Sequence, residues 1–243
     1  MITVTWLIGL QGSRVLDSKG RYGPTNRAMS SEIAEILSPE AELALVHTPA
    51  KLRRALRIIF EFDARLARIV AATSEPMLGQ MRLAWWRDTL GQDVADRPTG
   101  DAVLDGIGQH WRGREAALVK LIDGWEHLLA PPPLGEDDAR AFAEGRRAAL
   151  SAVFEGDGEA VGSAASRWAL ADLAAKVSLY EERAMLVRLG LEDARKLPRL
   201  PREARGLAVL GSLARRALDR GGRPLMEGRG AAITAARAAI LGR

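Results

Sequence analysis

The sequence predicts an all-α protein built as one domain, and three observations favour this fold class. Alanine supplies much of the apolar 47% of the 243 residues while aromatic residues make up only 5%, and alanine favours helices over strands. No stretch of β-branched residues alternates with period two, as a half-buried strand would. Helix start and stop signals recur along the chain, and no linker-like composition separates two halves.

Prolines and glycines divide the chain into the expected helices. The pairs Ser38-Pro39 and Thr48-Pro49 each place a capping residue before a proline in the first helical turn, and Ser74-Glu75-Pro76 opens another helix similarly. Glycine and proline clusters mark the breaks. The expected helices span residues 31–37, 39–46, 49–72, 76–91, 101–109, 113–129, 136–154, 158–189, 202–219 and 229–241.

The first 28 residues differ from the rest. They contain several glycines and no helical period, whereas Met29 is followed at once by two serines that suit a helix N-cap. We therefore expect a poorly structured extension over residues 1–28 and an all-α domain over residues 29–243. The apolar run VTWLIGL is too short to span a bilayer and lacks the basic residues of a signal peptide.

Composition argues against several classes of function. The chain has no cysteine, which excludes disulfides and thiolate chemistry. Its formal charge of +4 comes from basic residues interleaved with acids, so we expect no nucleic-acid partner. The three histidines are far apart and form no metal motif. A cytoplasmic protein is expected, and attraction to an anionic membrane surface or to a diphosphate stays open.

Three charged residues fall on apolar helix faces. Asp63 lies in the middle of one such face, Arg82 lies between two apolar flanks of the next helix, and Asp172 lies among apolar residues of the 158–189 segment. A lone buried charge is costly, so each needs a partner or water. Either the charges brace a helical bundle or they line a polar pocket. We expect Asp63 to pair with Arg82, because their helices are consecutive.

Trp85 and Trp86 stand side by side in the sequence QMRLAWWRDTL. They point about 100° apart on a helix, so both are expected to pack against different neighbours in the core.

Two segments resemble the squalene/phytoene synthase family. The first contains IIFEFDARLARIV, then SEP, then MLGQMRLAWWRDTL, and is similar to the family's aspartate-rich helix followed by its tryptophan-arginine signature. The second, GSAASRWALADLAAK at residues 162–176, is similar to a later family helix, and LPRLP follows it. The resemblance implies an isoprenoid-synthase fold with helices around a central cavity. It also implies two D-x-x-x-D motifs whose carboxylates hold Mg²⁺ against a prenyl diphosphate.

The sequence departs from the family at those motifs. Alignment places the first motif on Ala67 and Ala71 and the second on Lys176 and Tyr180. Asp63, Arg82, Asp172 and Lys176 remain as residues expected to face the cavity, with Lys176 able to replace a missing cation as a fixed positive charge. We therefore assign no catalytic residue and predict no metal ligand and no cofactor, with Mg²⁺ expected only if the chain is an active prenyl transferase.

Three functions are compatible with this pattern. The first is a divergent family member without prenyl transfer, which binds an isoprenoid or lipid or assists the assembly of a respiratory complex, as one family branch without intact motifs does for complex I. The second is an active Mg²⁺-dependent prenyl transferase that condenses farnesyl or geranylgeranyl diphosphate. The third is a helical interaction module with a solid core and no ligand.

Overall fold

Helices begin close to the expected start signals in the computed structural model, which describes residues 35–154, 158–192 and 199–242. Ser38 caps the first helix, because its Oγ accepts a hydrogen bond from the Ala41 N–H at 3.4 Å. Thr48 does not cap the second helix, because its hydroxyl donates to the Ala44 carbonyl of the preceding helix instead. The ten α-helices of the described residues are α1 (Pro39–Val46), α2 (Ala50–Ala71), α3 (Pro76–Leu90), α4 (Ala102–His110), α5 (Glu115–Glu126), α6 (Glu136–Ser151), α7 (Gly158–Ala174), α8 (Tyr180–Glu192), α9 (Arg205–Asp219) and α10 (Gly230–Leu241).

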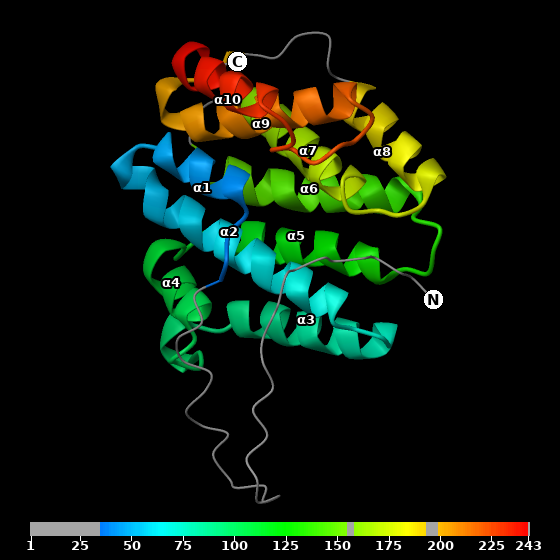
Figure 1. The fold of residues 1–243 in the computed structure, drawn as a ribbon. Helices are drawn as coiled ribbons and strands as arrows, with labels where there is room; N and C mark the ends of the chain where they lie inside the picture. The colour runs from blue at the N-terminus through cyan, green and yellow to red at the C-terminus, as the bar shows by residue number, and fades with distance from the viewer. Residues whose placement is uncertain (1–34, 155–157, 193–198, 243) are drawn as a thin grey trace, which may run out of the picture.

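The helices stack in layers, which confirms the all-α fold class (Figure 1). The main stack is a series of helices in which each one packs against the next, in the order α3, α5, α6, α7, α9 and α10. Helix α2 contacts α3, α5 and α6, while α1 lies against α9 and α8 lies against α7. The described residues also form three short 3₁₀ turns, η1 (Val94–Asp96), η2 (His127–Leu129) and η3 (Arg202–Ala204). The core fills the spaces between successive layers.

Two glycines let α5 and α6 approach closely. A Cβ atom on Gly145 would lie 2.6 Å from the Lys120 carbonyl oxygen and 3.1 Å from the Gly124 Cα atom. Both atoms belong to the backbone of α5, which cannot move aside as a side chain can. The close approach of α5 and α6 therefore requires a residue without a side chain at position 145.

Two expected helices differ from the structure. The described part of 31–37 is not helical, because Glu35 is buried and pairs with Arg65 and Arg68 of α2, which holds this segment alongside that helix. The expected 158–189 helix is broken between α7 and α8. Arg183 donates to the carbonyls of Ala174 and Val177 at 3.3 and 2.7 Å, so it satisfies carbonyls that a continuous helix would use. The expected extension at residues 1–28 and its boundary at Met29 lie outside the described residues.

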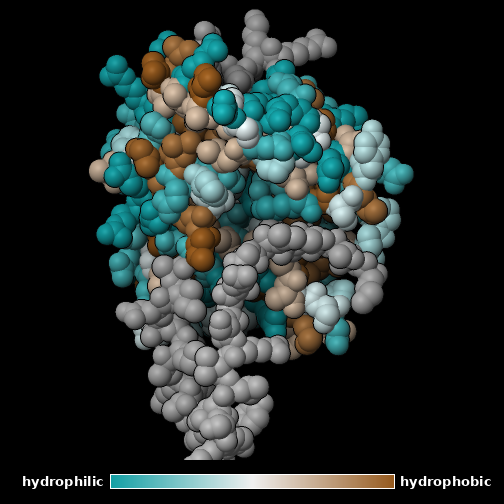
Figure 2. Space-filling model, viewed as in Figure 1, coloured by the Kyte–Doolittle hydropathy of each residue, from teal (hydrophilic) through white to brown (hydrophobic). Residues whose placement is uncertain are grey.

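The surface mixes apolar and polar residues over the described part of the face in Figure 2. None of the described helices is both long and apolar enough to cross a membrane. Helix α3, at the edge of the stack, exposes four large apolar side chains, those of Met77, Leu78, Met81 and Trp85. Trp86 is buried against Phe62, but Trp85 is 47% exposed, so the expectation that both tryptophans are core residues was wrong for Trp85.

Candidate functional site

The candidate site is centred on Arg146 of α6. This side chain is only 3% exposed, although arginine is rarely buried so completely without partners. Its position follows from helical periodicity, because Phe142 and Leu150 lie one turn before and after it on the buried face of α6. The helix thus carries a cation into the space between α2 and α7.

Arg146 links the two aspartates that the sequence places on apolar faces. Its Nε and Nη2 atoms donate to the two carboxylate oxygens of Asp63 of α2 at 3.0 and 2.7 Å, a side-on bidentate pairing of guanidinium and carboxylate. Its Nη1 atom donates to Asp172 of α7 at 2.8 Å. The indole N–H of Trp125 adds a bond to Asp63 at 2.8 Å. One guanidinium therefore ties three helices together.

Aromatic rings surround the guanidinium of Arg146. Its Cζ atom lies 4.3 Å from the ring centre of Trp168, 4.7 Å from that of Phe142 and 5.4 Å from that of Trp125. Such rings attract a cation through their negative faces and exclude water from it. Arg146 and the two aspartates are therefore shielded from bulk solvent, and their ion pairs are weakly screened.

Lys176 completes the charge balance at the α7 side. Its ammonium lies 2.7 and 2.8 Å from the two carboxylate oxygens of Asp172, one helical turn earlier. Burial alone would raise the pKa of the Asp172 carboxyl, but the charges of Lys176 and Arg146 lower that pKa to about 2. For Arg146, burial alone would lower the pKa of the guanidinium. The charges of Asp63 and Asp172 outweigh burial, so the pKa of Arg146 is raised. The four charges sum to zero at neutral pH.

Glu40 of α1 is a buried acid whose pKa is influenced by the charges of Asp172 and Lys176. Burial raises its pKa, and the negative charge of Asp172 raises it further. Burial and the nearby charge of Asp172 therefore disfavour the charged form of Glu40, and the positive charge of Lys176 offsets only part of this effect.

These residues do not fit the Mg²⁺ ions that the family resemblance implies. Magnesium needs several oxygen ligands, and all four carboxylate oxygens of Asp63 and Asp172 already accept bonds from Arg146, Trp125 or Lys176. An added divalent ion would also lie beside two fixed cations. Within residues 35–154, 158–192 and 199–242, no three acidic or histidine side chains are grouped as metal ligands would be.

The expected pairing of Asp63 with Arg82 was wrong. Asp63 binds Arg146, whereas Arg82 lies on the exposed side of α3. The sequence signal that could have found Arg146 is the same helical wheel, because this arginine shares an apolar face with Phe142 and Leu150. The interpretation that the buried charges form ion pairs between helices of the bundle was right for Asp63 and Asp172, which both pair with Arg146.

The positions aligned with the family motifs do not share one wall. Ala67 is half-buried and Ala71 is exposed near the end of α2. Tyr180 is 81% exposed and begins α8, so it does not follow Lys176 on a continuous helix as expected. Of the four residues expected to face a cavity, the structure brings together Asp63, Asp172 and Lys176, and it does so around the Arg146 side chain.

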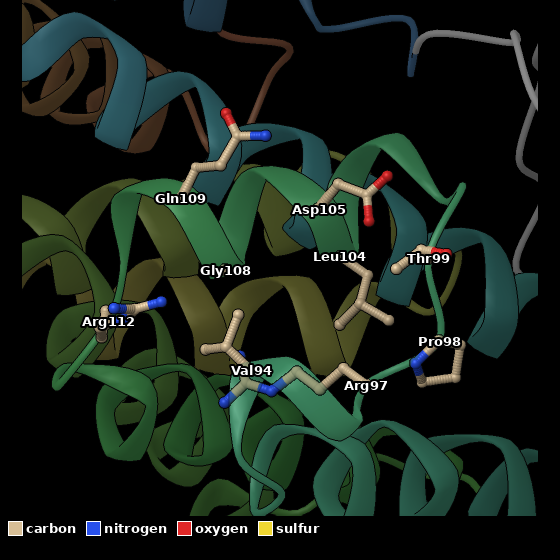
Figure 3. Close-up of a pocket in the computed structure, with 9 residues that line it drawn as sticks. All are labelled: Val94, Arg97, Pro98, Thr99, Leu104, Asp105, Gly108, Gln109 and Arg112. Atoms are coloured by element: carbon tan, nitrogen blue, oxygen red, sulfur yellow. The ribbon is translucent and has the colours of Figure 1, made fainter.

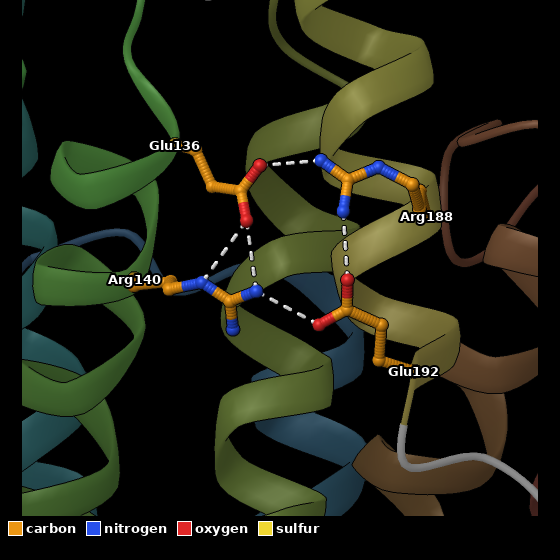
Figure 4. Close-up of polar contacts among 4 residues, drawn as sticks. All are labelled: Glu136, Arg140, Arg188 and Glu192. Carbon is orange, nitrogen blue, oxygen red and sulfur yellow. Dashed lines mark hydrogen bonds and ion pairs between the residues drawn. The ribbon is translucent and has the colours of Figure 1, made fainter.

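A second polar cluster joins α6 to α8 at the surface (Figure 4). Arg140 binds Glu136 and Glu192 at 2.9 Å, and Arg188 binds the same two carboxylates at 2.5 and 2.7 Å. All four side chains are about half exposed to solvent, so salt screens their attraction. A surface pocket of about 320 Å³ adjoins this cluster and is lined in part by Arg140, Ser166 and Glu192.

Comparisons with protein-family models, with curated proteins and with solved structures each returned no match.

Proposed function

We propose that this chain is a divergent member of the squalene/phytoene synthase family that no longer transfers prenyl groups and acts instead as a binding or assembly protein. The observation that carries the proposal is Arg146, which bonds both inward aspartates at 2.7–3.0 Å. Its guanidinium bonds Asp63 and Asp172, the acids that were expected to face the cavity, so neither carboxylate is free to bind a metal ion in place of the missing motifs.

The charge balance supports the loss of prenyl transfer. Ionisation of a prenyl diphosphate requires positive charge that is free to neutralise the departing diphosphate. Arg146 and Lys176 are each held by aspartates, so the cluster as a whole is neutral. A diphosphate at this place would have to displace those carboxylates and enter the aromatic surroundings of Arg146.

The outward face of α3 supports a role in binding. Met77, Met81 and Trp85 follow one another at intervals of four residues and are each about half or more exposed. Exposed apolar residues in a contiguous row are typical of surfaces that meet a partner. Such a surface suits assembly beside a membrane better than chemistry in a cavity.

Turnover of prenyl diphosphates tests the loss of catalysis. The full chain is incubated with farnesyl or geranylgeranyl diphosphate and Mg²⁺, and release of diphosphate and labelled hydrocarbon is measured. We expect no release above that of buffer. Release that depends on Mg²⁺, is abolished by Asp63→Asn and Asp172→Asn, and survives the exposed control Asp88→Asn would instead establish the active prenyl transferase.

Deletion of the gene tests the assembly role. We expect cells without the chain to lose respiratory complex I, measured as NADH oxidation and as the intact complex on native gels. The wild-type chain should restore it, whereas Met81→Glu with Trp85→Glu should not. Ile233→Glu, at an exposed apolar residue of α10, is the matched control and should restore it. Normal complex I in the deletion strain would rule out this role and favour the helical module without a ligand.

A further inference from the structure

The positive charge of this protein is concentrated in the layer formed by η3, α9 and α10. Residues 199–242 carry nine arginines against three acids, a net charge of +6, although the whole chain has a net charge of +4. The remaining residues therefore sum to −2. Charge gathered on one side of a protein attracts anionic partners to that side, and the attraction reaches about 8 Å at physiological ionic strength.

The pocket between η1 and α4 does not share this excess of positive charge. It measures about 680 Å³ and has Arg97 and Arg112 in its walls (Figure 3). Arg97 pairs with Glu115 at 3.2 Å, and Asp105 lines the same pocket, so these four charges sum to zero. An anionic partner is therefore attracted to the α9–α10 layer rather than to this pocket.

Acids within the α9–α10 layer neutralise only part of its charge. Asp219 binds Arg215 at 2.9 Å. The single carboxylate of Glu227 is shared by Arg220 and Arg223, at 3.2 and 3.1 Å. One carboxylate between two guanidiniums leaves a positive charge on the loop that joins α9 to α10.

Helix α10 turns isoleucines away from the body of the protein. Its buried residues are all alanines, Ala231, Ala235 and Ala238, and the helix packs on α9. Ile233 and Ile240 lie directly opposite these alanines on the helical wheel, about two turns apart, and are 63% and 75% exposed. Because α10 is the last helix of the stack, its isoleucines point straight into solvent (Figure 1).

Two arginines flank these isoleucines on the same side of α10. Arg229 and Arg237 are both exposed, and within the described part of the chain no ion pair involves either of them. The helix itself has no acidic residue over Gly230–Leu241. Figure 2 shows hydrophobic residues beside hydrophilic ones at the end of the molecule where α10 lies. This outward side of α10, made of Arg229, Ile233, Arg237 and Ile240, is called the α10 outer face below.

A bilayer surface that carries negative charge suits both kinds of side chain. The isoleucines gain by leaving water for the acyl boundary, while the guanidiniums stay with the lipid phosphates. A nucleic acid would pair with the arginines but would leave the isoleucines in water. A neutral bilayer would accept the isoleucines but would give the arginines no attraction.

We propose that the α10 outer face docks this protein on the surface of an anionic bilayer. Helix α10 lies along the surface, and α3, at the opposite end of the stack, points away from it (Figure 1). The proposal does not rest on the assembly role, because that role is assigned to α3 and lipid binding is measured on the purified chain.

Co-sedimentation with vesicles tests the proposal. The full chain is mixed with vesicles of phosphatidylcholine alone or with about one third phosphatidylglycerol, and the bound fraction is measured. We expect at least about tenfold tighter binding to the anionic vesicles, and weaker binding to them in about 0.5 M salt. Equal binding to both vesicles, no binding to either, or duplex DNA bound more tightly per phosphate would overturn the proposal.

Two double variants locate the contact. Arg229→Glu with Arg237→Glu should weaken binding to anionic vesicles by at least about tenfold, since each arginine near such a surface contributes roughly fivefold. Arg82→Glu with Arg112→Glu is the matched control, because it changes the net charge equally at exposed arginines away from α10. The control should keep binding within about threefold of the wild-type chain. Equal losses in the two variants would mean that net charge alone governs binding and would refute docking through α10.

A fluorescent label reports which helix meets the lipid. Because the chain has no cysteine, Ile240→Cys provides a single site for an environment-sensitive dye. Met81→Cys, on the exposed side of α3, is the matched control. We expect anionic vesicles to shift the emission of the dye to the blue at position 240 and to leave it unchanged at position 81. A blue shift at position 81 without one at position 240, or no shift at either, would contradict the proposal.

Discussion

Replacing Arg146 by methionine removes the guanidinium that holds α2, α6 and α7 together. The change deletes three bonds of 2.7–3.0 Å from a side chain that is 3% exposed. Asp63 would keep only the Trp125 N–H, and Asp172 would keep Lys176. Removing one partner of a buried ion pair costs about 3–5 kcal/mol, because the other charge stays buried. Methionine fills the place of the arginine stem, so we expect a loss of about 4 kcal/mol without a large cavity.

Urea unfolding at pH 7, followed by circular dichroism at 222 nm and by tryptophan fluorescence, measures this loss. With a slope of about 2.5 kcal/mol per molar urea, a loss of about 4 kcal/mol lowers the midpoint by about 1.6 M. Arg82→Met is the control, because Arg82 is exposed and its replacement should change stability by less than about 0.5 kcal/mol.

A second variant separates lost charge pairing from lost packing. Changing Arg146 to methionine together with Asp63→Leu and Asp172→Leu removes all three buried charges, and apolar replacement of a buried ion pair is often neutral or stabilising. We expect this triple variant to recover most of the stability lost by Arg146→Met. A loss below about 1 kcal/mol in Arg146→Met, or a triple variant no more stable than the single one, would refute the reasoning.

Three further measurements follow from the packing and the charges. The Asp172 carboxyl has a pKa of about 2 when folded and near 3.9 when unfolded, so its stabilisation is present above about pH 4 and is lost as pH falls to about 2. Asp172→Asn should flatten the fall of urea midpoints over that range, and an unchanged fall would contradict this. Gly145→Ala should cost about 1–3 kcal/mol despite better helix propensity, since its Cβ would meet the α5 backbone, whereas Gly91→Ala, with ordinary contacts only, should not. Arg188→Ala should lower the thermal midpoint in low salt and have no effect in about 1 M salt, because its partners Glu136 and Glu192 are exposed; an equal effect in both would contradict screening.

Local signals were sufficient for most of the helices. Ser38 and Pro39 predict the start of α1 because capping and a fixed proline φ act within a few residues. The long amphipathic pattern of 49–72 predicted α2, observed at Ala50–Ala71, for the same reason. The break after Ala174 has no glycine or proline to announce it. It depends on Arg183, nine residues further on, whose side chain turns back to the end of α7.

By itself, the sequence determined the fold class and the need for buried partners at Asp63 and Asp172, since helical periodicity and the cost of an unpaired charge are local properties. The identity of those partners was decided only by the tertiary structure. Arg82 lies on the next helix along the chain, yet Arg146, 83 residues from Asp63, binds this aspartate, because the stacking of α6 between α2 and α7 directs its side chain there. The pairing of two charges buried in a core is set by which helix faces meet, and that is settled by packing across the whole domain.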